Sequence, residues 1–245
     1  MIQKGLVSIS FRGNTVEEIL DACVKTGLTV IEWGSDVHAP VGDLARAKEV
    51  GEKTRAAGLS CAAYGAYYKI GCDMTDFEDY AKTARALGTD VIRIWGGWHG
   101  SAEITPEARE KLIAETKDIC RIGREYGMTL AFECHHGTIT DDPDYALAFL
   151  RDVGADNLKM YWQPNQFKTF EANLAAAKIL KPYVVNVHVF HWDAENRYSM
   201  AEGVSDWQQY TEVFSDGDHA FMLEFMPDNQ IATLPREAAV LHTLA

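Results

Sequence analysis

Eight apolar segments, rich in β-branched and aromatic residues, recur along the whole chain and alternate with longer amphipathic segments. Each apolar segment is hydrophobic at nearly every position, which is typical of strands covered on both faces in a parallel sheet. The pattern predicts strands at residues 5–10, 29–34, 60–68, 90–97, 129–136, 158–164, 184–192 and 220–226.

The amphipathic segments predict helices between these strands. In residues 15–27, apolar side chains at Val16, Ile19, Leu20 and Val24 have helical spacing, and Gly27 follows where a left-handed cap is expected. Residues 43–58 and 106–127 also end in glycine, and the second of these segments begins with proline. The chain therefore reads as repeated strand–helix units.

Eight such units without a linker predict a single (β/α)8 barrel domain over residues 1–245, with an open doubly wound sheet as the alternative. In a barrel, functional side chains lie at the carboxyl ends of the strands and in the loops that follow them. This rule selects the candidate residues below.

Composition narrows the classes of partner. The chain has 36 acidic and 23 basic residues, a net charge of −13, and its basic residues are scattered, so we expect no nucleic-acid partner. No apolar stretch approaches bilayer length and the first residues lack a signal-peptide core, so we expect a cytoplasmic protein without a membrane partner. The five cysteines contain no C-x-x-C pair.

Two glutamates lie inside apolar strands, where a charge is costly unless it is paired or binds a cation. Glu133 and Glu224 are both near strand ends. His188 and Gln163 end the two strands between them, so the last four strands each bring one donor to the same rim. The alternatives are a glutamate neutralised by Arg93 and a histidine that only packs in the core.

Two carboxylates, one imidazole and one amide oxygen form a mixed donor set that suits a divalent ion. We therefore predict that Glu133, Gln163, His188 and Glu224 bind Mn, Mg, Co or Zn.

The chain resembles the xylose isomerase-like barrels, which include sugar phosphate isomerases and epimerases. The resemblance lies in LAFECHHG (130–137), VHVFHWDAENR (187–197), AEGVSDW (201–207) and LEFMPD (223–228). It implies that Glu133 and Glu224 bind the metal and transfer protons on opposite sides of a carbon next to a carbonyl. It also implies a homo-oligomer, dimeric or tetrameric.

The sixth strand departs from the family pattern D-x-x-H, because Gln163 and Gln166 replace the Asp and the His. The site thereby loses one negative charge, and Gln166 can bind substrate by hydrogen bonds but cannot act as a base. By the same resemblance, Arg197 is expected to contact substrate.

Aromatic and histidine side chains crowd the predicted rim, a mixture that suits a carbohydrate. Of these we select His38 and His135 as substrate contacts. The predicted function is a metal-dependent sugar or sugar phosphate isomerase or epimerase. The alternatives are a metal-dependent dehydratase or lyase on a keto-cyclitol or oxidised sugar, and a non-catalytic barrel that binds a sugar. A related class of endonucleases is disfavoured by the net charge and the few ligands.

Overall fold

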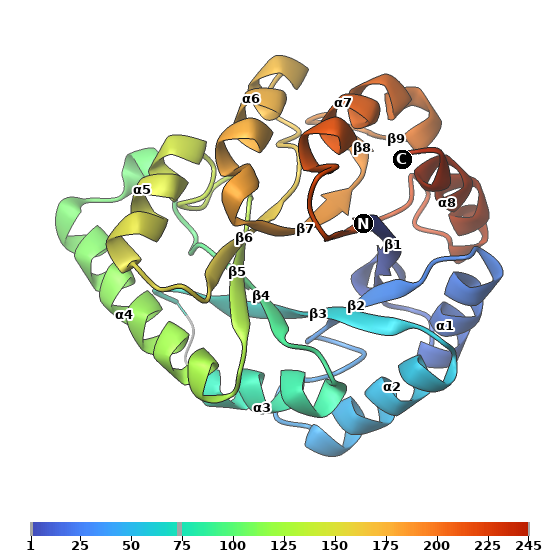
Figure 1. The fold of residues 1–245 in the computed structure, drawn as a ribbon, viewed down its shortest axis with the longest axis horizontal. Helices are drawn as coiled ribbons and strands as arrows, with labels where there is room; N and C mark the ends of the chain where they lie inside the picture. Colours follow the sequence, from blue (N-terminus) through green and yellow to red (C-terminus); the bar gives the residue numbers. More distant parts are fainter. Residues whose placement is uncertain (1, 73–74, 245) are drawn as a thin grey trace.

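A computed structural model describes residues 2–72 and 75–244, which form a closed barrel of parallel strands surrounded by helices (Figure 1). The strand order around the barrel is β1-β10-β7-β6-β5-β4-β3-β2. The barrel strands are β1 (Ile2–Val7), β2 (Val30–Gly34), β3 (Ser60–Lys69), β4 (Val91–Trp95), β5 (Thr129–Glu133), β6 (Leu158–Trp162), β7 (Val184–Val189) and β10 (His219–Leu223). The predicted barrel is confirmed.

Each barrel strand is followed by one helix of the outer ring. These are α1 (Val16–Lys25), α2 (Leu44–Ala56), α3 (Phe77–Leu87), α4 (Pro106–Glu125), α5 (Pro143–Val153), α6 (Phe170–Leu180), α7 (Val204–Phe214) and α8 (Leu234–Thr243). The helix starts are fixed locally: Thr15 and Glu18 form a capping box on α1, and Thr105 caps α4 ahead of Pro106. Gly27 adopts the left-handed conformation that its position requires.

Six of the eight predicted strands, those predicted to end at residues 10, 97, 136, 164, 192 and 226, extend two or three residues past the ends of the observed strands. The chain leaves the sheet after Val7, because Ser8–Phe11 form a 3-10 turn in which Ser8 Oγ accepts a hydrogen bond from Gly34 N at 2.9 Å. Residues 184–192 are also not one strand. After Val189 the chain turns into an antiparallel hairpin of β8 (His191–Trp192) and β9 (Arg197–Tyr198), which pair with each other and not with the barrel.

The strand side chains alternate between two cores. Those that point outward pack under the helices in a large cluster that includes Trp33, Phe132 and Trp162. Those that point inward form a smaller cluster in which Ala63 and Ala131 occur beside Tyr161 and Met222. Small residues inside the barrel leave volume for the large polar side chains described next.

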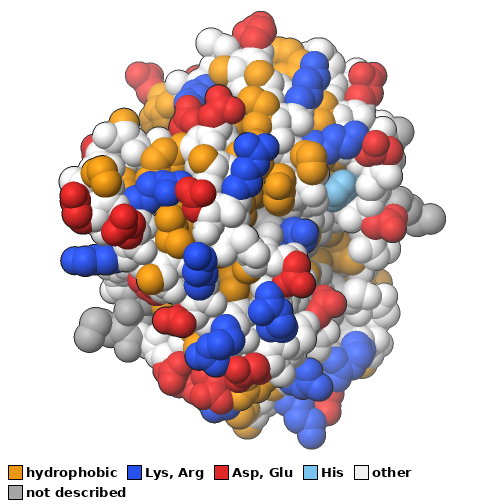
Figure 2. Space-filling model, turned by 60° about the vertical axis from the view of Figure 1, so that its left-hand side comes forward, with side chains coloured by type: hydrophobic (Ala, Val, Ile, Leu, Met, Phe, Trp, Pro, Cys, Tyr) orange, Lys and Arg blue, Asp and Glu red, His pale blue; other side chains and the backbone are white. Residues whose placement is uncertain are grey.

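The outer surface carries charges of both signs. On the face drawn in Figure 2, acidic, basic and hydrophobic side chains are interspersed. Within the described ranges, no helix has both the length and the hydrophobicity that crossing a bilayer requires.

Candidate metal centre and catalytic pocket

The four residues predicted to bind a metal come together at the carboxyl ends of β5, β6, β7 and β10. All four are buried. Glu133, His188 and Glu224 each offer one ligand atom, and these atoms lie within 4.8 Å of one another. His188 Nδ1 is 3.6 Å from Glu224 Oε2 and 3.9 Å from Glu133 Oε1. The side chains converge because every one occupies an inward position of its strand.

Gln163 lies directly against this triad. Its Oε1 is 2.9 Å from His188 Nδ1, within hydrogen-bonding distance. The structure thus places Gln163 beside the other three residues, and its role as a ligand stays a prediction.

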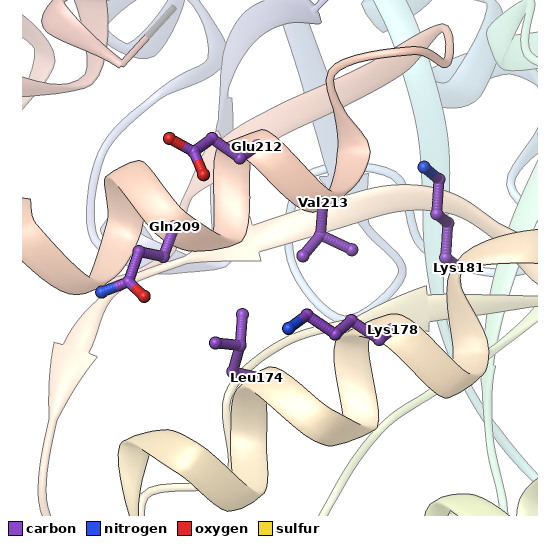
Figure 3. A pocket seen from close by; sticks show the side chains of 6 residues that line it. All are labelled: Leu174, Lys178, Lys181, Gln209, Glu212 and Val213. Carbon is purple, nitrogen blue, oxygen red and sulfur yellow. The ribbon is translucent and has the colours of Figure 1, made fainter.

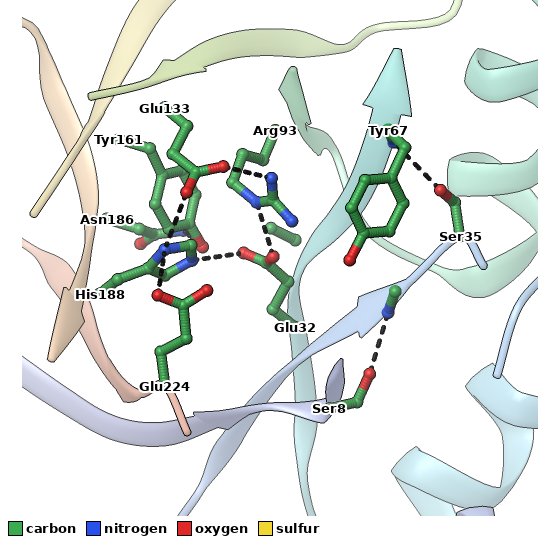
Figure 4. A network of polar contacts seen from close by, with 12 residues as sticks. Ser8, Glu32, Ser35, Tyr67, Arg93, Glu133, Tyr161, Asn186, His188 and Glu224 are labelled. Carbon is green, nitrogen blue, oxygen red and sulfur yellow. Dashed lines mark hydrogen bonds and ion pairs between the residues drawn. The ribbon is translucent and has the colours of Figure 1, made fainter. Parts of the chain in front are cut away.

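Two further charged residues, Glu32 of β2 and Arg93 of β4, lie beside the triad and contact it (Figure 4). The Arg93 guanidinium donates from Nε to Glu32 Oε1 at 2.8 Å and from Nη1 to Glu133 Oε2 at 2.5 Å. The other oxygen of Glu32 is 3.3 Å from His188 Nε2. The alternative in which Arg93 neutralises a glutamate therefore holds for Glu133, although Glu133 is also part of the triad.

Sequence reasoning missed Glu32 even though the signal was present. Glu32 is a charged residue between apolar neighbours in a predicted strand, which is the same signal that selected Glu133. Its side chain is 0% exposed.

Burial and charge together shift the pKa values at this site. Burial alone would raise the pKa of Glu32, but Arg93 and His188 outweigh it and lower this pKa to about 2. Burial alone would lower the pKa of His188, and the carboxylates of Glu224, Glu32 and Glu133 reverse that effect and raise it. For Glu224, burial dominates and raises the pKa to about 7. The carboxylate of Glu224 is therefore the one that lacks a full counter-charge.

A cavity of about 220 Å³ opens above these residues. Its floor and walls combine charged, amide and aromatic side chains, as expected for a small hydroxylated ligand. It is lined by Ile9, Arg12, Tyr67, Arg93, Trp95, Glu133, His135, Gln163, Gln166, Trp192, Glu224 and Phe225. Phe225 adopts a φ of 52°, a conformation rare for a bulky residue, and its N–H donates to Ser10 Oγ at 2.8 Å. This backbone turn directly follows Glu224 at the cavity wall.

The four residues predicted to contact substrate have different locations. His135 and Gln166 line the cavity, where His135 lies 4.4 Å from Trp95 between ring centroids. Arg197 lies outside it and is exposed, with its guanidinium 4.5 Å from the ring of Phe225 and hydrogen-bonded to Asn229 at 2.5 Å. Arg197 is thus placed behind one wall of the cavity.

His38 also lies outside the residues that line the cavity. It is 2% exposed, and its two ring nitrogens lie 3.2 Å from Ser8 Oγ and 3.2 Å from Asn14 O. Because both nitrogens are occupied by protein partners, the structure gives His38 a role in joining the loops after β1 and β2.

The donor set fits a divalent cation. Two ligand atoms at right angles, each about 2.1 Å from a cation, lie about 3.0 Å apart, and His188 Nδ1 and Gln163 Oε1 are 2.9 Å apart. The charges also agree: the carboxylates of Glu32, Glu133 and Glu224 and the guanidinium of Arg93 sum to −2. A divalent cation would neutralise this buried charge.

The sequence pattern of the family described as "Xylose isomerase-like TIM barrel" matches residues 20–244. The chain belongs to this family. Over 184 residues, 67% of the chain, it is 26% identical to a 3-dehydroshikimate dehydratase of Bacillus anthracis. The aligned part covers 66% of that relative, slightly less than two thirds of its length.

Several solved structures share this fold. The probable 3-DHS dehydratase AsbF of Bacillus anthracis has a TM-score of 0.83 at 19% identity, with 99% of both chains covered. An L-ribulose 3-epimerase has a TM-score of 0.74 at 15% identity, covering 99% of this chain and 94% of that one. A D-psicose 3-epimerase of Clostridium cellulolyticum H10 has a TM-score of 0.73 at 13% identity, covering 99% and 98%.

A second hollow, of about 450 Å³, lies between α6 and α7 in the outer ring (Figure 3). It is lined by two aliphatic side chains, Leu174 and Val213, and by the polar side chains of Lys178, Lys181, Gln209 and Glu212. In this xylose isomerase-like barrel the carboxyl ends of the strands, rather than this groove, gather the buried polar side chains.

Proposed function

We propose that this barrel is a divalent-metal-dependent enzyme that removes a proton from the carbon next to a carbonyl of a small hydroxylated substrate. Glu133, Gln163, His188 and Glu224 would hold the cation. When bound, the cation would supply Lewis-acid stabilisation of negative charge on the carbonyl oxygen. The cavity directly above these residues would hold the substrate.

Glu224 is the residue that would accept the proton. Its Oε2 is 3.6 Å from His188 Nδ1. Among the described residues, no donor hydrogen-bonds to its Oε1, and the side chain lines the cavity. A carboxylate with one uncommitted oxygen beside the substrate can act as a general base.

Glu133 differs from Glu224 in this respect. Its Oε2 accepts a hydrogen bond from Arg93 at 2.5 Å, and its Oε1 faces His188. A proton accepted at Oε2 would have to displace the guanidinium. The main observation behind the proposal is therefore that Arg93 hydrogen-bonds to Glu133, which leaves Glu224 as the carboxylate that can transfer a proton.

One proton-transferring carboxylate favours loss of water over inversion of a centre. In this reaction Glu224 takes the proton, and the C–H electron pair forms the new C=C bond as the C–O bond of the β-hydroxyl breaks. The departing hydroxyl takes up the proton and leaves as water. The 26% identity to a 3-dehydroshikimate dehydratase supports this choice.

A 3-epimerase is the second candidate. It is supported by the two carboxylates of Glu133 and Glu224 on either side of His188 and by the fold shared with ketose 3-epimerases. For this reaction Arg93 would have to release Glu133 during turnover.

The substrate proposed is not phosphorylated. Barrels often bind phosphate with free N–H groups in the last two βα loops. Here two N–H groups in these loops already donate hydrogen bonds to carboxylates of the protein. Glu237 Oε2 accepts from Met200 N at 2.6 Å, and Asp228 Oδ1 accepts from Gln230 N at 3.0 Å.

The test uses the Mn²⁺-loaded protein with a panel of free and phosphorylated ketoses and hydroxy-ketone ring acids in D₂O, followed by mass spectrometry. A dehydratase yields a product lighter by one water, and an epimerase yields an isomer that carries one deuterium. Glu224→Gln should abolish either reaction, whereas Glu237→Gln, a buried glutamate outside the site, should retain it. Failure to bind Mn²⁺, or full turnover by Glu224→Gln, would contradict the proposal and favour a sugar-binding barrel without catalysis.

A further inference from the structure

We propose that Glu32 is a positioning residue that fixes the tautomer of His188 and thereby sets the affinity of the site for a divalent cation. This inference rests on the metal site proposed above, but it concerns a residue that is not one of the ligands.

Glu32 lies beside the ligands with both carboxylate oxygens in use. Oε1 accepts a hydrogen bond from Arg93 Nε at 2.8 Å. Oε2 lies 3.3 Å from His188 Nε2. The side chains of Glu32 and His188 are both 0% exposed, so their contact is shielded from bulk solvent.

The contact with Oε2 determines which imidazole nitrogen carries the proton. An ionised carboxylate only accepts hydrogen bonds, so Nε2 facing it must carry the hydrogen. Once the Nδ1 proton that faces Gln163 Oε1 has left, the neutral ring presents the lone pair of Nδ1. Nδ1 is also the atom nearest to Gln163 Oε1 and Glu224 Oε2, at 2.9 and 3.6 Å. Glu32 therefore turns the metal-binding lone pair toward the other ligands, as buried carboxylates do for metal-bound histidines.

Glu32→Gln tests this because Arg93 fixes the orientation of the new amide. Arg93 can only donate, so the amide oxygen must stay at the position of Oε1. The NH₂ group then takes the position of Oε2 and donates to His188 Nε2. This forces the imidazole proton onto Nδ1, where it blocks the lone pair, although the variant is nearly isosteric.

The measurement is Mn²⁺ binding by titration calorimetry on the wild type, Glu32→Gln and the matched control Glu237→Gln. Glu237 is also buried and accepts hydrogen bonds, but it lies in α8, where its carboxylate accepts from Met200 N in the turn before α7. We expect about 10- to 100-fold weaker binding for Glu32→Gln and unchanged binding for the control. Binding within threefold of wild type by a folded Glu32→Gln would overturn the inference alone. Absence of binding by the wild type would overturn the proposed function itself.

A second measurement does not depend on the variant folding. In wild-type protein labelled with ¹⁵N-histidine and loaded with diamagnetic Zn²⁺, NMR should show His188 protonated at Nε2 and unprotonated at Nδ1. Protonation at Nδ1 would overturn the inference, and a merely structural role for Glu32 would not predict either tautomer.

Discussion

Arg93→Met is the perturbation whose effect follows most directly from the structure. The guanidinium is 1% exposed and hydrogen-bonds to two buried carboxylates, Glu32 at 2.8 Å and Glu133 at 2.5 Å. Methionine preserves most of the side-chain volume but removes the positive charge that pairs with both carboxylates. Breaking a buried ion pair from one side costs about 3–5 kcal/mol.

This cost converts into a melting temperature. The entropy of unfolding near Tm is about 2.1 cal/mol/K per residue, or about 0.5 kcal/mol/K for a chain of this length. We therefore expect Arg93→Met to lower Tm by about 6–10 °C in EDTA at pH 8, measured by circular dichroism. The matched control is Arg124→Met, which removes an exposed pair with Asp156 and should leave Tm unchanged.

The double variant Glu32→Gln/Arg93→Met should recover part of the loss, because one of the two stranded charges is gone. A drop of less than about 2 °C for Arg93→Met, or a double variant less stable than Arg93→Met alone, would refute the reasoning. Either result would mean that the carboxylates are not held ionised by this arginine.

Three further outcomes are expected. Mn²⁺ in EDTA-free buffer should raise the Tm of the wild type, because binding at 100 times Kd adds about 2.7 kcal/mol to the free energy of unfolding. Glu224→Gln should show a much smaller rise in Tm in differential scanning fluorimetry. Gly65→Ala should lower both Tm and Mn²⁺ affinity, because the added Cβ would lie 2.5 Å from Glu32 Oε1, whereas Gly13→Ala, with no atom within 4 Å, should change neither. Burial lowers the pKa of His38 in the folded state, so the unfolded chain takes up its proton first and the free energy of unfolding falls as pH drops below about 6.5. His38→Asn should weaken this acid dependence in urea titrations between pH 7 and 5, and an unchanged slope would contradict it.

The fold and the ring of candidate ligands could be predicted because both depend on local pattern. Continuous apolar strands, helix caps and Gly27 gave the repeating unit, and the barrel rule placed Glu133, His188 and Glu224 at one rim. The strand ends were less predictable. The hairpin at His191 looks like more of β7 in sequence, and only its antiparallel pairing separates the two.

The polar network beside the ligands shows where sequence reasoning stopped. Glu32 and Arg93 have the same inward parity as the ligands, so a consistent two-residue alternation would have selected them. Which carboxylate oxygen Arg93 occupies, and which nitrogen of His188 faces Glu32, depend on distances between strands that are distant in sequence. Likewise, His38 follows a strand end, but its ring nitrogens contact Ser8 and Asn14 and it does not line the cavity.

The lack of a charge at position 163 has a physical explanation. Counted with an aspartate at that position, the buried groups Glu32, Glu133, Glu224 and Arg93 would carry −3, and a divalent cation would leave one uncompensated charge inside the barrel. With Gln163 the same groups carry −2, which a divalent cation neutralises. Since an unpaired buried charge costs several kcal/mol, the amide at position 163 and the arginine at position 93 are matched features of one site. Replacing either alone should disturb this balance, so Gln163→Asp should require a compensating proton, and the pH dependence of Mn²⁺ binding by that variant should be steeper than that of the wild type.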